Sequence, residues 1–188
     1  NPNTIVVLVA GSSMAIGWMD QHIPAIIDAW YPGEQGGTAI AEVLFGDYNP
    51  AGRLPLTFYN SIEDLPDFDD YNVKNNRTYM YFEGKPLYAF GYGLSYTKFD
   101  YRNLNIKQDT QNVTLNFSIK NSGKYNGDEV AQVYVKFPDQ GIKTPLKQLK
   151  GFKRVHIKKG ATEQISIEIP KDCLLYTSPS PRDRSLSR

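Results

Sequence analysis

Acidic side chains are concentrated in one short stretch, where paired carboxyl groups could act as acid and base. They are Glu63, Asp64, Asp67, Asp69 and Asp70. Acid–base catalysis by two carboxyls requires one that is buried enough to stay protonated and one that stays ionised. The stretch is polar and interrupted by a proline, so we expect a solvated loop. It lacks the spaced ligands and glycine of an EF-hand loop, which makes Ca²⁺ binding the weaker alternative.

The candidate nucleophiles and bases are few and lie far apart in the sequence. Ser12 and Ser13 follow an apolar segment, where α/β sheets bind ligands, but no Gly-x-Ser-x-Gly motif surrounds them. His22 and His156 stand in separate regions, and Cys173 is the only cysteine. A disulfide framework and a cysteine-based zinc site are therefore unavailable. We predict no metal site and no cofactor.

Two tryptophans could stack on the ring of a polar ligand such as a sugar. Trp30 has helical spacing to other apolar residues and is expected in the core, whereas Trp18 is expected in a polar loop after the first strand. Trp18 is therefore the candidate substrate-binding residue. Arg53 and Arg77 are expected to hold loops through charge-assisted hydrogen bonds.

The composition excludes several classes of partner. Lys and Arg number 21 against 20 Asp and Glu, so a net charge of +1 provides no basic field for nucleic acid. No apolar run reaches the roughly 18 residues of a membrane span. Gly91 and Gly93 do not form a dinucleotide fingerprint, because the third glycine and a following helix are missing. We expect them to permit close backbone packing.

The elements that must position these residues begin with an apolar run at residues 5–10, which predicts a parallel strand buried on both faces. Residues 22–30 have apolar side chains at helical spacing and predict a helix. A second helix is predicted from about residue 34 to 45, ended by Gly46. Because these elements cannot close a sheet, we interpret residues 1–96 as the incomplete C-terminal part of an α/β sandwich domain.

The connection between this layer and the rest of the chain has strong turn signals. Residues 46–57 contain two glycines and two prolines, which demand a fixed turn before the chain becomes extended. Further on, residues 77–82 are rich in aromatic side chains and predict a short strand. Both stretches are interpreted as structural rather than chemical.

After Thr97 the apolar pattern changes to period two. Alternating segments occur at residues 113–119, 130–137, 149–157 and 162–169, separated by turns. They predict an all-β sandwich of fibronectin type III character at residues 97–173, although such a fold has about seven strands and four or five are visible.

The last segment, residues 174–188, is rich in Ser, Pro and Arg and has no apolar period. A disordered basic tail is one interpretation, and non-native read-through is the one we prefer. The sandwich is then truncated, with unpaired edges and exposed apolar faces, and we expect the isolated chain to aggregate.

Five sequence blocks, taken in order, resemble glycoside hydrolase family 3. Three lie in the first half and two resemble the fibronectin type III-like domain of that family. They are WYPGEQGG at 30–37, EVLFGDYNPAGRLP at 42–55, FGYGLSYT at 90–97, GDEVAQVYV at 127–135 and LKGFKRV at 149–155. The resemblance covers nearly all of residues 1–173.

The resemblance implies a fragment of a retaining β-glycosidase that acts at the non-reducing ends of β-linked oligosaccharides. In the family the nucleophilic Asp belongs to an N-terminal barrel, and the acid/base Glu precedes the part of the sandwich domain present here. No residue of this chain matches either motif, so we assign no catalytic residue and expect the chain alone to be inactive. Residues 77–86 resemble the β-xylosidase branch more than the β-glucosidase branch, and a secreted or periplasmic location is implied.

A second hypothesis belongs to another functional class. A non-catalytic carbohydrate-binding or scaffolding module with a fibronectin-like domain would also contain a sandwich and exposed aromatic residues. A general α/β hydrolase or transferase is a weaker third hypothesis, since the chain has no nucleophile motif.

Overall fold

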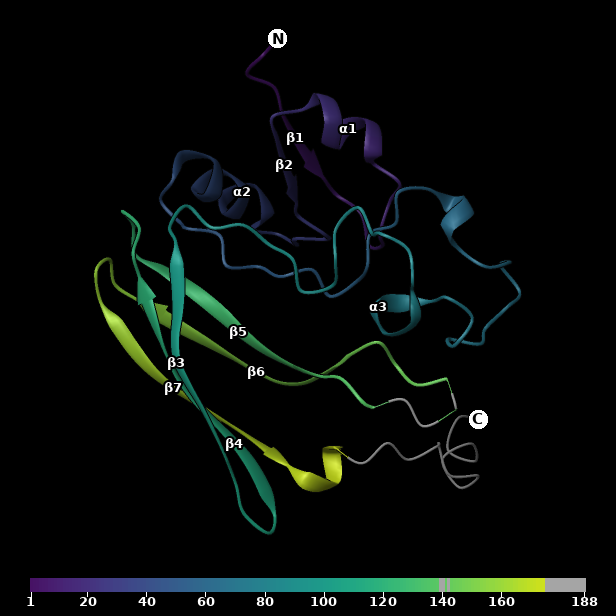
Figure 1. Cartoon of the computed structure of the whole chain (residues 1–188). Coiled ribbons are helices and arrows are strands. Elements are labelled where there is room, and N and C mark those ends of the chain that lie inside the picture. The colour runs from purple at the N-terminus through teal and green to yellow at the C-terminus, as the bar shows by residue number, and fades with distance from the viewer. Residues whose placement is uncertain (139–140, 142, 175–188) are drawn as a thin grey trace.

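We describe a computed structural model of the chain, in which residues 1–138, 141 and 143–174 are described. An α/β layer formed by the N-terminal residues lies against a β-sandwich formed by the C-terminal ones (Figure 1). This arrangement confirms the predicted order of an α/β layer followed by an all-β sandwich. None of the helices in these ranges is long and apolar enough to cross a membrane.

The α/β layer is built on two parallel strands, β1 (Ile5–Leu8) and β2 (Ala25–Asp28). The helix α1 (Gly17–His22) connects them. The prediction of a strand buried on both faces is wrong for β1, because Ile5 is 49% exposed and only Leu8 is buried. Within the described residues β1 has β2 as its single neighbouring strand, so part of its apolar surface remains open.

The predicted helix at residues 22–30 is also wrong. The segment contains β2, which pairs in register with β1 from Ala25 opposite Ile5 to Asp28 opposite Leu8. A short apolar run fits either element, and its periodicity alone does not distinguish a helix from a buried strand. Here the β-branched Ile26 packs against a core cluster formed by Leu8, Ile16 and Phe58, which decides in favour of the strand.

The second predicted helix is confirmed as α2 (Gly36–Phe45). Gly46 ends it with a φ of 87°, and its N–H donates to the carbonyls of Glu42 and Val43. Glycine adopts this left-handed conformation without steric cost, which explains why the helix ends there.

The segment that follows is mostly irregular, with a 3₁₀ turn η1 (Ile62–Asp64) and a single helical turn α3 (Thr78–Tyr81). The short aromatic strand predicted at residues 77–82 is therefore wrong. Tertiary contacts determine the backbone here: the Thr78 N–H donates to the Tyr59 hydroxyl at 2.9 Å, and Phe82 packs edge-to-face on Tyr59.

The sandwich has two antiparallel sheets, one with strand order β3-β4-β7 and one with order β5-β6. The four alternating segments form β4 to β7, as predicted, and a short η2 follows. The first strand, β3, is an additional one that its polar sequence and a bulge between Arg102 and Asn105 concealed. The bounds are β3 Phe99–Gln108, β4 Asn112–Asn121, β5 Gly127–Val135, β6 Gln148–Ile157, β7 Thr162–Pro170 and η2 Lys171–Leu174.

The main core lies between these two sheets. Its members are buried side chains contributed by four strands, and three of them, Ile119, Ile157 and Ile169, are at most 1% exposed. Alternation along each strand places these residues on inner faces, as period-two patterning requires. Of the segment predicted as non-native, residues 175–188 lie outside the described residues.

Candidate functional site at the loop edge and the domain boundary

Trp18, the candidate substrate-binding residue, lies on the short helix α1 and is 67% exposed, so the prediction that it lies in a loop is wrong. Its indole stacks on the His22 ring, with centroids 4.5 Å apart and planes 13° apart. The Nδ1 atom of His22 lies 2.8 Å from the Trp18 carbonyl oxygen, which fixes the histidine beneath the indole. One flat aromatic surface is therefore held in place and open to a ligand.

A carboxyl group lies at the end of the neighbouring strand. Burial raises the pKa of Asp28, against the opposing effect of a hydrogen bond from the Trp30 N–H. Its Oδ2 atom is buried and has no hydrogen-bond partner among the described residues. Trp30 itself has a φ of 53° and packs against the Leu8 cluster, which confirms its predicted core position.

The two serines form no catalytic arrangement in the part of the chain that the structure describes. Ser12 is exposed and Ser13 half-buried, and neither hydrogen-bonds a histidine or a carboxylate there. His22 stacks on Trp18, and His156 lies in the other domain, where its Nδ1 is 2.6 Å from Asp128.

The acidic segment at residues 63–70 is a loop shaped by its own hydrogen bonds. Asp64 accepts from the backbone of Asn60 and Ser61, and Asp70 accepts from Asn72 and Asn75. The bonds from Asn75 and Asn72 lower the pKa of Asp70, and the Ser61 hydroxyl lowers that of Glu63. Glu63 and Asp70 are solvent-exposed and favour the ionised form, which confirms the prediction of a solvated loop. Residues 1–138, 141 and 143–174 contain no cluster of three ligating side chains able to hold a metal ion.

An ion pair with little solvent exposure lies at the domain boundary. Arg53, from the turn at residues 46–57, forms a 2.8 Å ion pair with Glu129 of β5, and each side chain is 12% exposed. The second carboxylate oxygen of Glu129 accepts a hydrogen bond from the Tyr101 hydroxyl at 2.8 Å. The predicted loop-holding role of Arg53 is confirmed, and its partner is 76 residues away in sequence.

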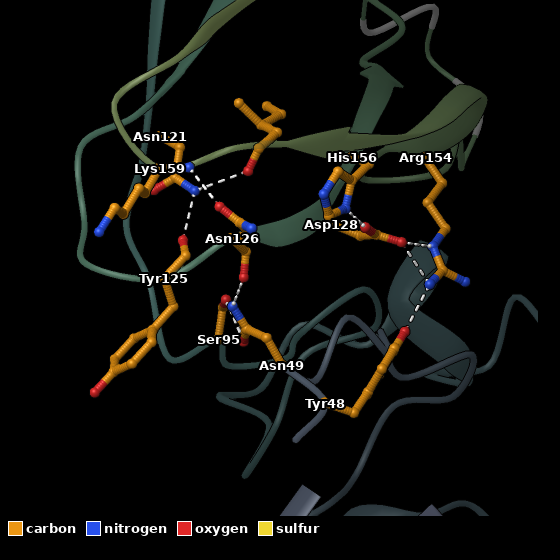
Figure 2. Close-up of polar contacts among 11 residues, drawn as sticks. Tyr48, Asn49, Ser95, Asn121, Tyr125, Asn126, Asp128, Arg154, His156 and Lys159 are labelled. Atoms are coloured by element: carbon orange, nitrogen blue, oxygen red, sulfur yellow. Dashed lines mark hydrogen bonds and ion pairs between the residues drawn. The ribbon is translucent and has the colours of Figure 1, made fainter. Parts of the chain in front are cut away.

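The turn is also fixed by an amide. Asn49 donates to the Asn126 carbonyl at 2.9 Å and accepts from the Ser95 hydroxyl at 3.0 Å (Figure 2). It also accepts from the Tyr96 N–H at 2.8 Å. Beside it, the Tyr48 hydroxyl accepts from Arg154 of β6.

Arg154 belongs to a charged group at the same boundary. It forms an ion pair with Asp128, which also contacts His156 (Figure 2). Burial acts to raise the pKa of Asp128, but the hydrogen bonds and charges of His156 and Arg154 outweigh it and lower that pKa. The Asp128 carboxylate is therefore ionised and holds Arg154 and His156 in place.

An aromatic contact completes the boundary. Phe90 stacks on Tyr79 with ring centroids 4.1 Å apart, and Tyr134 of β5 packs edge-on against both rings. Gln132 donates to the Gly91 carbonyl, and a Cβ on Gly93 would overlap the Gly52 carbonyl oxygen. This confirms that the two glycines permit close backbone packing. Together, these contacts orient the two domains, and the polar groups in them are already mutually bonded.

Comparison with known protein families identifies both domains. Residues 1–96 match the model of the glycosyl hydrolase family 3 C-terminal domain, and residues 129–185 match that of a fibronectin type III-like domain. The chain belongs to glycoside hydrolase family 3.

Named relatives in family 3 include enzymes with two different sugars in their names. A xylan 1,4-beta-xylosidase of Xylanibacter ruminicola is 44% identical over 174 residues, covering 92% of this chain and 20% of the relative. A periplasmic beta-glucosidase of Salmonella typhimurium is 37% identical over 187 residues, covering 92% of this chain and 24% of the relative. The chain thus spans about a fifth to a quarter of these two family 3 relatives.

Solved family 3 structures share the arrangement of both domains. Beta-glucosidase 3B from Thermotoga neapolitana, in complex with glucose, superposes with a TM-score of 0.87 at 34% identity. The match covers 93% of this chain and 27% of that protein. Beta-D-glucoside glucohydrolase from Trichoderma reesei gives the same score at 28% identity, covering 95% and 29%.

Sequence reasoning about this family 3 chain did not find the partners at the boundary. Glu129, Tyr101 and Asn126 are ordinary polar residues in alternating strands or turns, and their spacing gives no signal. The sequence indicated the boundary only through the density of Gly and Pro at residues 46–57. This density predicts a rigid turn but not the residues that the turn contacts.

Proposed function

We propose that this chain is the C-terminal part of a retaining β-glycosidase that hydrolyses O-glycosyl bonds at the non-reducing ends of β-linked oligosaccharides. The observation that carries the proposal is the match of both domains, in one arrangement, to a beta-glucosidase structure with a TM-score of 0.87. We take residues 1–96 as the α/β domain, 97–173 as the fibronectin-like domain and 174–188 as non-native. A glycoside substrate and an N-terminal barrel domain are the partners of this part.

The catalytic carboxyls in this proposal lie outside the chain. A retaining mechanism requires two carboxyl groups about 5 to 5.5 Å apart, one of them held neutral as the acid. The acids of the exposed loop favour the ionised form, and Glu129 and Asp128 are already paired with arginines. The role of these residues is then to hold one wall of the active site.

We favour a β-xylosidase over a β-glucosidase. Support comes from residues 77–86 and from the 44% identity to a protein named xylan 1,4-beta-xylosidase, against 37% for a named beta-glucosidase. In the complete enzyme we expect kcat/KM for an aryl β-xyloside to exceed that for the matching aryl β-glucoside at least tenfold, about 1.4 kcal/mol in transition-state binding. Steady-state kinetics with both substrates tests this, and NMR of the first product should show a retained β-anomer. Equal or reversed preference would contradict the choice of sugar, and an inverted product would contradict the mechanism.

We propose that Trp18 contacts the substrate in the complete enzyme. Its fixed, exposed indole supports this, because sugar rings bind through apolar C–H faces to flat aromatic surfaces. Trp18→Ala should raise KM roughly tenfold with little change in kcat, as the loss of uniform binding predicts. Trp18→Phe should recover most of the affinity. The matched control is Phe45→Ala on α2, an aromatic residue that is 84% exposed. An unchanged KM for Trp18→Ala, or an equal effect of the control, would remove the assignment.

A further inference from the structure

The helix α1, which carries Trp18, has few stabilising interactions of its own. It is six residues long, its N-cap Ile16 makes no side-chain capping hydrogen bond, and none of its residues is buried. Helices of this length are marginal in water and depend on tertiary contacts for their stability. The orientation of the Trp18 indole therefore depends on the contacts that fix α1 to the rest of the domain.

One such contact joins α1 to the connecting segment, residues 87–92. The Tyr88 hydroxyl donates to the Asp20 Oδ1 atom at 2.5 Å. Within the described residues, no other side chain of α1 forms a hydrogen bond outside the helix. A hydrogen bond to a carboxylate is shorter and stronger than one between neutral groups. Burial raises the pKa of Tyr88, and the hydrogen bond to Asp20 and its charge raise it further, so the phenol keeps the proton that it donates.

Asp20 and Trp18 lie on opposite faces of α1. They are two residues apart in sequence, which corresponds to about 200° around an α-helix. His22, four residues after Trp18, lies on the same face as the indole and stacks on it. The bond from Tyr88 thus holds the helix from the side away from the indole, and it can fix the direction of Trp18 without covering it.

The connecting segment gives Tyr88 a fixed base. The Phe58 N–H donates to the Tyr88 carbonyl at 2.9 Å, and the Tyr88 ring stacks on Tyr92 with centroids 5.2 Å apart. Near the end of the segment, Gln132 of β5 donates to the Gly91 carbonyl at 3.1 Å. The segment is therefore held by the α/β layer and by the sandwich, and Tyr88 joins α1 to this support.

We propose that Tyr88 and Asp20 are positioning residues for the substrate contact of Trp18 in the complete enzyme. This inference rests on the proposed function, in which the indole binds the sugar. Tyr88 and Asp20 act through the helix: their bond sets the orientation of α1, and α1 sets that of the indole. Loss of the bond should leave the chemical step intact, because the catalytic carboxyls of the proposed enzyme lie elsewhere.

The kinetic test uses the complete enzyme and an aryl β-xyloside. Tyr88→Phe removes the hydroxyl and keeps the ring, and it should raise KM about fivefold with little change in kcat, an effect of the size of one hydrogen bond. Asp20→Ala should do the same, whereas Asp20→Asn keeps an acceptor oxygen and should recover most of the affinity. The matched control is Tyr96→Phe, which loses a hydroxyl bonded at 2.7 Å to the Val43 carbonyl of α2 and should leave KM unchanged.

A double variant shows whether the effect passes through the indole. Once Trp18→Ala has raised KM, adding Tyr88→Phe should raise it no further, whereas independent roles would multiply the two effects. Multiplied effects would overturn the positioning role. So would a wild-type KM for Tyr88→Phe in an enzyme that does respond to Trp18→Ala.

Hydrogen exchange separates a failure of this proposal from a failure of the proposed function. In the complete enzyme Tyr88→Phe should speed exchange of the α1 amides about fivefold, including those of Asp20 and Ile23, which donate to backbone carbonyls, and Tyr96→Phe should not. Faster exchange together with an unchanged KM for Trp18→Ala would overturn the substrate contact and leave the attachment of α1 by Tyr88 standing. Unchanged exchange in α1 would overturn the positioning role whatever the kinetics.

Discussion

Arg53→Leu is expected to destabilise the chain by about 3 kcal/mol, because it leaves the carboxylate of Glu129 buried without its counter-charge. Tyr101 still donates to Glu129, but one neutral hydrogen bond does not replace an ion pair whose two side chains are 12% exposed. Burial and the neighbouring Glu129 charge already raise the pKa of Tyr101, so the phenol remains a donor. Thermal unfolding should show a Tm lower by roughly 6–12 °C.

The matched control is an exposed ion pair that also joins an arginine to a carboxylate. The Arg102 Nη2 atom lies 3.5 Å from the Asp100 Oδ2 atom, and the two side chains are 57% and 43% exposed. Arg102→Leu should cost less than about 1 kcal/mol, as exposed pairs do. The double variant Arg53→Leu/Glu129→Leu should recover much of the loss, since both charges are then absent. Equal Tm values for Arg53→Leu and Arg102→Leu would show that the boundary pair does not hold the domains.

Asn121→Ala is expected to have a similar or larger effect, about 3–4 kcal/mol. Asn121 is 0% exposed. Its amide N–H groups donate to the carbonyls of Tyr125 and Ile157 at 2.8 and 2.9 Å (Figure 2), and its oxygen accepts from Thr97 and Gly123 at 2.6 and 3.1 Å. Truncation leaves several buried groups without a partner, each of which costs about 1–3 kcal/mol. Chemical denaturation of the variant measures this loss.

Two further variants separate the amide network from simple loss of volume. Asn121→Asp keeps the shape but places a carboxylate oxygen against two carbonyls, so it should destabilise nearly as much as alanine. Asn116→Ala, on the same strand and half-buried, makes no side-chain hydrogen bond in the described structure and should change stability by less than about 1 kcal/mol. If Asn121→Asp were as stable as the wild type, the four hydrogen bonds would not be what stabilises this site.

Local sequence patterns predicted the elements in which one physical signal dominates. The alternation at residues 113–119 becomes β4 because one face of that strand must meet the core, where Ile119 is fully buried. Gly46 ends α2 because a left-handed residue is required there. In both cases the information is contained within a few neighbouring residues.

The failures arise where distant contacts determine the conformation. Residues 22–30 have spacing that suits a helix, yet Ala25–Asp28 pairs with β1 and becomes a strand. Residues 77–82 have strand-like aromatic residues, yet contacts with Tyr59 and Phe90 hold one helical turn. Strand β3 was concealed by polar residues that face solvent around its bulge.

The same limit applies to the domain boundary. The sequence indicated that Arg53 would hold a loop, but the identity of its partner Glu129 depends on how the sandwich folds against the α/β layer. Trp18 was selected by its residue type and polar surroundings, and the structure adds that its indole is fixed on His22. Its contact with a sugar stays a prediction.

The central claim, that the catalytic carboxyls lie outside this chain, is tested most directly by assaying the purified 188-residue chain with aryl β-xyloside and aryl β-glucoside. The complete enzyme, assayed in parallel, is the positive control. The account predicts turnover by the complete enzyme and none above the buffer rate by the chain, even when the chain is shown to be folded. Turnover by the chain that is abolished by substituting one of its own carboxylates, such as Asp28→Asn, would contradict it.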